Sequence, residues 1–404
     1  MKFTADAVVC TKCANEYPLI NSVVTIHQEE RPEICFERDA ARDTERVPEL
    51  GGINEEFSDL ARAQGQLREA ILSLPYGNAS KYFHEEGYFK NGASHAPAVD
   101  YLLSKLRIAA GIRLLDLGAD LTWSTQLFAK AGAKCIAMDI NHHLEVGRLY
   151  QEAFDISYDL LSCDMHKPVF AEQSFDVITA LSVLHHSSAL NSLTAHLAKL
   201  LRPGGVIAVL EPYCLYDEDK QHFGTDQIEA GINENVYTLD EWHQALSAAG
   251  LVLEDFLLGN GFCALYRKNA GSSRGLFDSF YDGAISEVTA PKSSFNPGDS
   301  IGLKVVVENL GKGNWLGEGL TPVNLSYHLF KIEPSGERRL LTFDNPRLPI
   351  VPHLPAGETR DFAYELSCPS DAGEYEAVFD LVRERVTWFE QQGFSIGRFK
   401  FTVG

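Results

Sequence analysis

The hydrophobic positions of residues 112–139 follow the pattern of a buried strand, a turn, a helix and a second buried strand. The first strand is apolar almost without a break, as in a parallel strand that is covered on both faces. Gly118 predicts a tight turn after this strand. Thr122 or Ser124 can cap the helix that follows, and Gly132 can end it.

The second strand ends at Asp139. The distance in sequence between Asp139 and the first turn indicates that this carboxylate binds a ligand. In doubly wound folds, a carboxylate about 20 residues after the first βα turn binds the hydroxyls of a ribose. A pyrophosphate cofactor such as NAD needs further glycines in that turn, but the run here is GADLT, and only Gly118 remains. The turn also lacks the Gly-Lys-Ser/Thr sequence of a phosphate-binding loop. We therefore expect a nucleoside-containing ligand other than a pyrophosphate cofactor.

Alternating strand and helix patterns continue over residues 97–270 and predict an α/β domain. The sequence Gly-Asn-Gly at residues 259–261 separates the last two strands, and this hairpin sequence predicts that the last strand is antiparallel to its neighbour. Thr238 and Glu241 have the spacing of a capping box, which predicts the start of a helix. Further strands are predicted over Cys135–Met138, Phe175–Ser182, Val206–Glu211, Val252–Leu258 and Phe262–Arg267.

The pattern changes to all-β after the glycine- and serine-rich residues 271–275. Short strands separated by turn sequences predict a separate β-sandwich of immunoglobulin-like type over residues 276–404. With Asn309, Trp315 and the run FDLVRERVTWF at matching places, this part resembles accessory sandwiches of bacterial proteins in cell-surface polysaccharide pathways. The predicted strands are Ile301–Glu308, Val323–Phe330, Arg339–Phe343, Arg360–Leu366, Tyr375–Val382 and Arg398–Val403.

Composition and net charge exclude some classes of binding partner and indicate a cellular location. The formal net charge of −21 argues against a basic face, so neither nucleic acid nor a membrane is expected as a partner. The first residues lack the apolar core of a secretory signal, and no run approaches the ~18 apolar residues of a membrane span. Eight mostly isolated cysteines suit a reducing compartment, so a cytoplasmic location is expected.

Five motifs follow one another in order along residues 97–268. Each motif alone is weakly specific, but their order and spacing together are specific. This part resembles class I S-adenosylmethionine-dependent methyltransferases, which implies a Rossmann-like seven-stranded domain with S-adenosylmethionine as cofactor. The motifs are LLDLG at the first turn, Asp139, SCDMH around Asp164, SFDVITALSVLHH at the fourth strand, and LLRPGGVIAVLEP into the fifth.

The resemblance implies a set of cofactor-binding residues at the ends of strands. The family usually carries a second glycine at the position of Asp120, and aspartate tolerates a left-handed backbone better than most residues, so the turn can survive. The implied residues are Asp116 and Gly118 against the methionine part, Asp139 at the ribose hydroxyls, Asp164 at the adenine amino group, Met165 on the adenine ring, and Ser182 facing the methyl donor.

Methyl transfer is a displacement at a sulfonium carbon, so placement of the acceptor supplies much of the rate. An alcohol acceptor also gains from a base that removes its proton. A polar, aromatic insert after the fifth strand can form a substrate lid, in which Asn233 and Glu234 either contact the substrate or form a helix-cap turn. The candidate bases are His185, His186, Glu211 and, further along, His222, of which we favour His186 or Glu211.

The first 96 residues carry weaker patterns. Residues 1–40 are predicted to form a hairpin segment, and residues 41–96 a helical lead with an aromatic loop that can cover the cofactor. Cys10 and Cys13 form a C-x-x-C turn that resembles half of the zinc ribbon preceding some bacterial methyltransferase domains. The sequence predicts either a zinc site at this pair or a hairpin with reduced thiols.

Two functions agree with these observations. The first is an S-adenosylmethionine-dependent methyltransferase that acts on a polar small molecule or a sugar or glycan, at an oxygen atom. The second is a methyltransferase-like binding or scaffold protein whose β-sandwich binds a glycan or another subunit. The sandwich can also serve as a homodimer interface.

Overall fold

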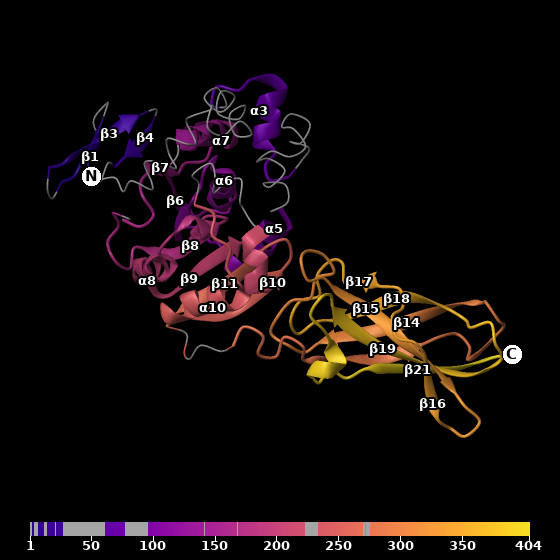
Figure 1. The fold of residues 1–404 in the computed structure, drawn as a ribbon. Coiled ribbons are helices and arrows are strands. Elements are labelled where there is room, and N and C mark those ends of the chain that lie inside the picture. The colour runs from indigo at the N-terminus through magenta and orange to yellow at the C-terminus, as the bar shows by residue number, and fades with distance from the viewer. Residues whose placement is uncertain are drawn as a thin grey trace. The chain divides into compact units, whose positions relative to one another are not determined.

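The computed structural model describes residues 2–3, 7–11, 14–20, 22–26, 61–76, 96–140, 142–167, 169–222, 233–269, 271 and 275–404. Two compact units divide the chain (Figure 1). The first unit comprises Met1–Glu254 and Phe262–Ser273, and the second comprises Asp255–Gly261 and Arg274–Gly404.

One sheet runs through the first unit, and its central strands confirm the predicted alternation. Its strands are, in spatial order, β1 (Lys2–Phe3), β2 (Ala7–Val9), β3 (Glu16–Ile20), β4 (Val23–Thr25), β7 (Asp159–Ser162), β6 (Lys134–Asp139), β5 (Arg113–Leu117), β8 (Phe175–Leu181), β9 (Leu201–Glu211), β11 (Phe262–Lys268) and β10 (Leu251–Leu258). From β4 to β9 all neighbours are parallel. β11 runs antiparallel to β9 and lies beside β10, the strand before it in the chain. The sheet is therefore mixed, with a doubly wound, Rossmann-like centre.

Helices connect the central strands and pack on one another in pairs. The helices are α3 (Gly65–Leu72), α5 (Ala96–Leu106), α6 (Trp123–Lys130), α7 (Gly147–Phe154), α8 (Leu190–Leu200) and α10 (Leu239–Ala248). Among them, α6 packs against α7, and α8 packs against α10. The predicted capping box is confirmed, because Thr238 and Glu241 exchange side-chain and backbone hydrogen bonds at the start of α10.

The start of α6 differs from the prediction. Thr122 precedes the helix with a φ of 61°, but its hydroxyl hydrogen-bonds the Tyr158 hydroxyl at 2.9 Å. The Ser124 hydroxyl donates to the Asp116 carboxylate at 2.7 Å. The predicted side-chain cap is therefore wrong, because both hydroxyls have buried tertiary partners. Gly132 follows the helix with a φ of 99°, as predicted.

The N-terminal strands extend the same sheet at one edge. β1 to β4 pair with one another as antiparallel hairpins. β4 then lies parallel to β7, with Val24 opposite Leu161 and Thr25 opposite Ser162. The described part of the segment over residues 1–40 is thus a run of hairpins that is continuous with the central sheet through backbone hydrogen bonds.

The second unit contains two β-sheets. In order, the smaller sheet consists of β12 (Gly283–Thr289), β14 (Ser300–Asn309) and β18 (Thr359–Ser367). The larger sheet consists of β13 (Ser294–Phe295), β21 (Gly397–Val403), β19 (Gly373–Arg383), β15 (Val323–Ile332) and β16 (Arg338–Thr342), with β17 (Leu348–Pro349) on β15 and β20 (Thr387–Trp388) on β19. The predicted strands recur within a few residues, and β12, β13, β17 and β20 are additions.

Aromatic side chains fill the core of the second unit. The ring of Tyr364 on β18 lies 5.7 Å from Tyr327 on β15 and 5.3 Å from Phe379 on β19, so the two sheets contact each other. Trp315 is fully buried, and its indole nitrogen donates to the Phe280 carbonyl at 2.9 Å. Asn309, which the sequence also marks, is buried and donates from Nδ2 to two backbone carbonyls. Both marked residues are parts of this core.

Asp380 makes the stability of the second unit depend on pH. It is fully buried on β19, and burial outweighs its hydrogen bonds from two backbone N–H groups, which raises its pKa to about 7. A carboxyl whose pKa is higher in the folded than in the unfolded state contributes stability at low pH, and that contribution is lost as pH rises from about 4 to about 7. Relative to Asp380→Asn, the wild-type free energy of unfolding should rise by roughly 2–3 kcal/mol from pH 8 to pH 5 in urea unfolding experiments.

The matched control is Asp371→Asn, since Asp371 is exposed. This variant should follow the wild-type pH profile. Parallel profiles for wild type and Asp380→Asn would contradict the prediction.

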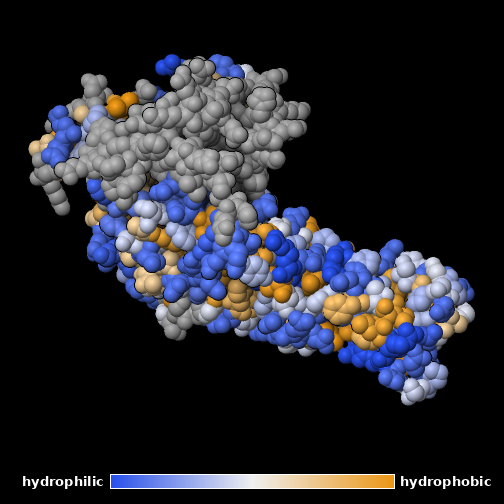
Figure 2. All heavy atoms as spheres, in the orientation of Figure 1, coloured by the Kyte–Doolittle hydropathy of each residue, from blue (hydrophilic) through white to orange (hydrophobic). Residues whose placement is uncertain are grey.

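The surface of the second unit carries apolar as well as polar side chains (Figure 2). On and next to β16, Leu340, Leu341 and Phe343 are exposed. Among the described residues, no helix combines the length and the hydrophobicity that crossing a membrane requires.

Candidate functional site

The turn after β5 is held against the neighbouring strand β6. The N–H groups of Gly118 and Ala119 both donate to the Met138 carbonyl, at 2.8 Å and 3.1 Å. The next N–H, of Asp120, donates to the Asp139 carboxylate at 2.9 Å. Gly118 has a φ of 68°, and a Cβ atom there would lie 2.4 Å from the Val183 Cβ. The turn therefore requires glycine at 118 and positions Asp139 beside it.

Asp120 adopts the left-handed backbone that the family's glycine would supply, with a φ of 39°. Its carboxylate points to His143, whose Nδ1 lies 2.6 Å from Oδ1. Burial disfavours a charged His143, but Asp120 and then Asp139 outweigh this effect and raise the His143 pKa. The sequence reasoning missed His143, and only its place shortly after Asp139 could have suggested it. The prediction that aspartate preserves this turn is confirmed.

The Asp116 side chain is buried between strands β5 and β8 and helix α6. Its carboxylate accepts hydrogen bonds from the hydroxyls of Ser124, Thr125 and Thr179, at 2.6–2.7 Å. Burial raises its pKa, against the effect of these hydrogen bonds. Asp116 thus fixes β5 to α6 and β8 directly below the turn.

The segment after β7 forms a small polar network. One oxygen of Asp164 accepts the His166 N–H at 2.8 Å and lies 3.0 Å from the His166 Nδ1. The other ring nitrogen of His166 lies 2.7 Å from the Ser187 hydroxyl. The Asp164 carboxylate therefore stabilises the turn in which it lies, through its contacts with His166. Met165, between these two residues, is half-buried. His166, within the marked SCDMH motif, links this segment to the loop after β8.

The end of β8 is held by Glu211 at the end of β9. Ser182 has a strained φ of 55°, and the short helix η3 (Leu184–His186) follows it. Glu211 is fully buried and accepts the N–H groups of Val183 and Leu184 at 3.2 Å and 2.9 Å. It also lies 2.7 Å from the His185 Nδ1. With both oxygens engaged, Glu211 positions the loop and the His185 ring.

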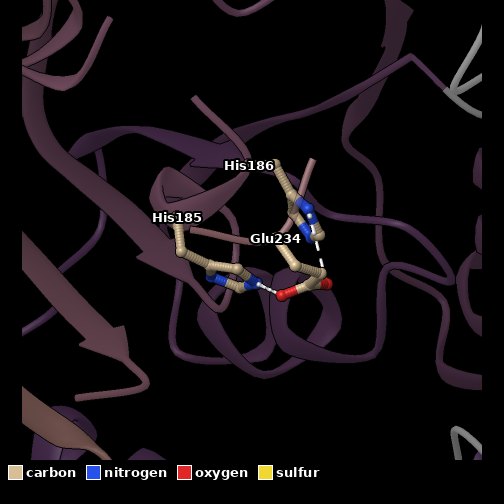
Figure 3. Close-up of side chains that lie close together, drawn as sticks. All are labelled: His185, His186 and Glu234. Carbon is tan, nitrogen blue, oxygen red and sulfur yellow. Dashed lines mark ion pairs between the residues drawn. The ribbon is translucent and has the colours of Figure 1, made fainter. Parts of the chain in front are cut away.

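Glu234 lies between the two adjacent histidines (Figure 3). Its Oε2 is 3.3 Å from the His185 Nε2, and its Oε1 is 3.7 Å from the His186 Nδ1. The His186 Nδ1 also lies 2.7 Å from the Asn233 carbonyl, to which it donates. Asn235 then donates to the His185 carbonyl from both its backbone and its side chain. The insert thus brings Glu234 to the histidine pair. Asn233 and Glu234 do not cap helix α10, because its N-cap residue is Thr238.

Electrostatics distinguish the two histidines. Burial alone would lower the His185 pKa, but its contacts with Glu211 and Glu234 raise this pKa to about 9. Burial and the charge of the adjacent His185 lower the His186 pKa. Burial opposes ionisation of Glu234, but the two imidazoles outweigh it and lower the Glu234 pKa. At neutral pH the cluster therefore holds a protonated His185, a neutral His186 and a carboxylate at Glu234.

The remaining candidates lie apart from this site or outside the described residues. Cys10 is half-buried after β2. Cys13 and the side chain of His222 are outside the described residues, so a zinc site at the cysteines and a base at His222 stay predictions.

Comparisons with known proteins agree with this geometry. A family model described as a methyltransferase domain matches residues 91–255. A sterol 24-C-methyltransferase of Gibberella zeae is 26% identical over 206 residues, which cover 46% of this chain and 54% of that protein. A ubiquinone biosynthesis O-methyltransferase of Nitrosococcus oceani is 32% identical over 133 residues, which cover 32% of this chain and 56% of that protein. The chain spans about half the length of these relatives.

Solved structures include a similar S-adenosylmethionine-dependent methyltransferase from Mesorhizobium loti. It is 18% identical, with a TM-score of 0.38, and the match covers 44% of this chain and 99% of that one. The matched family region contains the turn at Gly118, Asp139 and the histidine pair. On the family match, residues 91–255 are a methyltransferase domain.

Proposed function

We propose that this protein transfers a methyl group from S-adenosylmethionine to an oxygen of a polar small molecule or sugar. The observation that carries the proposal is the contact between the Asp139 carboxylate and the N–H of Asp120. It sets the acidic group that we expect to bind ribose against the tight turn at the carboxyl ends of two parallel strands, where doubly wound folds bind nucleosides.

The residues around this turn fit S-adenosylmethionine. The backbone approaches closely at Gly118, and Asp120 takes the left-handed conformation of the missing glycine. His143 pairs with the Asp120 carboxylate and so offsets the added negative charge. When bound, the cofactor supplies a methyl group on a positively charged sulfur. Asp139 would hold the ribose, and Asp164 with Met165 would bind the adenine.

The histidine cluster favours an acceptor that carries a proton to be removed. Ser182 and His186 follow strand β8, and Glu234 lies in the insert after β9, where we expect the acceptor to enter. A neutral His186 or the Glu234 carboxylate can take a proton from a hydroxyl, whereas a purely hydrocarbon acceptor has no such proton. Of the two kinds of relative, the one named as an O-methyltransferase therefore agrees better with this site.

Replacing Asp139 by alanine tests the proposal. A charged hydrogen-bonding group of this kind contributes about 1.5–3 kcal/mol, so the affinity for S-adenosylhomocysteine should fall about ten- to a hundredfold. Isothermal titration calorimetry measures this affinity directly, without a known acceptor.

The control is Asp176→Ala, which removes the same charge. Asp176 lies at the amino end of β8 and bonds Arg202 and the Arg113 N–H. This variant should bind S-adenosylhomocysteine like the wild type. If the wild type does not bind S-adenosylhomocysteine at millimolar concentration, the protein is not a methyltransferase enzyme, and the binding or scaffold function is favoured. The replacement of the family's glycine by Asp120 is compatible with that function.

We also propose that residues 276–404 form a separate domain, an immunoglobulin-like β-sandwich. Its two contacting sheets and its buried Trp315 support this assignment. A role for it in binding glycan, or as a homodimer interface, stays a prediction. Deleting residues 276–404 should weaken acceptor binding, and leave cofactor binding intact, if the unit binds sugar.

A further inference from the structure

The cluster of His185, His186 and Glu234 has the composition of a metal site. Among the described residues, each of these side chains offers one ligand atom, and the three atoms all lie within 4.8 Å of one another (Figure 3). Ligand atoms lie about 2.0–2.2 Å from zinc, so two ligands of a tetrahedral ion are roughly 3.4 Å apart. The Glu234 Oε2 lies 3.3 Å from the His185 Nε2, which is close to this spacing. The three ligand atoms are therefore close enough for a single ion to bind all three side chains once these rotate toward it.

Both imidazoles have the second hydrogen-bond partner that metal-binding histidines usually have. A metal-binding histidine usually donates its other ring N–H to a carboxylate or a backbone carbonyl, which fixes its tautomer. His185 Nδ1 has Glu211 as this partner, at 2.7 Å, and His186 Nδ1 has the Asn233 carbonyl, also at 2.7 Å. With Nδ1 engaged in this way, each ring would bind a metal through Nε2, and His185 would release its Nε2 proton when the metal binds. This pattern does not follow from methyl transfer alone.

The charges of the cluster also call for a cation. Glu211 is fully buried, and the side chain of Glu234 is only 16% exposed. Two carboxylates in such a place need compensating positive charge. A divalent ion would balance both carboxylates.

We infer that His185, His186 and Glu234 bind a divalent transition-metal ion, with zinc as the first choice. Two histidines and one carboxylate are a known ligand set for zinc and for ferrous iron, whereas magnesium prefers oxygen ligands. Three protein ligands leave a fourth position, and the side chain of His186 is 29% exposed, so this position can face solvent. In the methyltransferase proposed above, on which this role rests, the fourth ligand would be the acceptor oxygen.

Zinc binding by the full chain, made without a histidine tag, tests the inference. The metal is removed with a chelator, and zinc is then titrated by calorimetry into wild type and into Cys10→Ser. The Cys10→Ser variant disrupts the other candidate pair of zinc ligands, Cys10 and Cys13. Both should bind one equivalent with equal affinity. Cobalt substitution should give ligand-field bands without a thiolate charge-transfer band in Cys10→Ser.

Removing either ligand should weaken zinc binding about a hundredfold or more, in His186→Ala and in Glu234→Gln. Circular dichroism checks folding, and Glu234→Gln keeps the shape of the side chain if His186→Ala does not fold. The control is His196→Ala, since His196 lies on α8 outside the cluster. Loss of zinc binding in Cys10→Ser, or affinity of wild-type strength in Glu234→Gln, would overturn the inference.

The test separates this inference from the proposed function. S-adenosylhomocysteine is titrated in parallel with chelator present. Cofactor binding without zinc binding removes the metal site alone. Zinc binding without cofactor binding supports the metal site and removes the methyltransferase proposal.

Discussion

Gly118→Ala should abolish measurable binding of S-adenosylhomocysteine and lower the free energy of unfolding of the first unit by about 3 kcal/mol or more. Two separate costs add. An alanine in the left-handed region at a φ of 68° costs about 1–2 kcal/mol. The new Cβ would also lie 2.4 Å from the Cβ of Val183, which cannot rotate away because it is bonded directly to the backbone. Relief therefore requires the turn or the end of β8 to move.

Two further variants separate these costs. Gly204 has a similar φ of 76° with nothing within 4 Å of an added Cβ, so Gly204→Ala should show the backbone cost alone and bind the ligand normally. The double variant Gly118→Ala/Val183→Gly removes the clash and should recover part of the affinity. Urea unfolding and calorimetric titration provide the measurements. Equal behaviour of Gly118→Ala and Gly204→Ala would show that the contact with Val183 is unimportant.

Glu211→Ala should destabilise the first unit by about 3–5 kcal/mol. The substitution leaves the N–H groups of Val183 and Leu184 without their buried acceptor and removes the carboxylate partner of His185. Glu211→Gln should cost less, because an amide oxygen can still accept one set of these hydrogen bonds. Urea unfolding of the two variants gives the order of the effects.

The control is Glu172→Gln. Glu172 is exposed, so this variant loses a carboxylate without losing a buried contact. Its stability should lie within about 0.5 kcal/mol of the wild type. A Glu211→Ala variant as stable as Glu172→Gln would mean that Glu211 does not hold the loop after β8.

Local patterns in the sequence were enough to predict the central fold. The alternation of apolar runs and helical faces, the turn at Gly118 and the capping box at Thr238 all depend on neighbours within a few residues. The position of Asp139 at the end of β6 follows from the same local rules. These features are visible in a sequence because periodicity and turn chemistry act over one turn or one strand.

The predicted cap of α6 failed for the opposite reason. Thr122 and Ser124 have the residue types of a cap, but tertiary partners compete for their hydroxyls. The buried carboxylate of Asp116, which the sequence predicted as a cofactor contact, accepts the hydrogen bond of the Ser124 hydroxyl. A local rule cannot weigh a partner that is distant in sequence.

The composition of the site was decided only by the tertiary structure. The sequence by itself determined a doubly wound domain with a glycine turn and an acidic strand end. It also marked His185, His186, Glu211 and Glu234 separately. The structure placed Glu234 between the histidines, and Glu211 behind His185, across separations of 49 and 26 residues. These contacts depend on which strand ends adjoin in the sheet and on where the insert returns, and neither is encoded by residues that are neighbours in the chain.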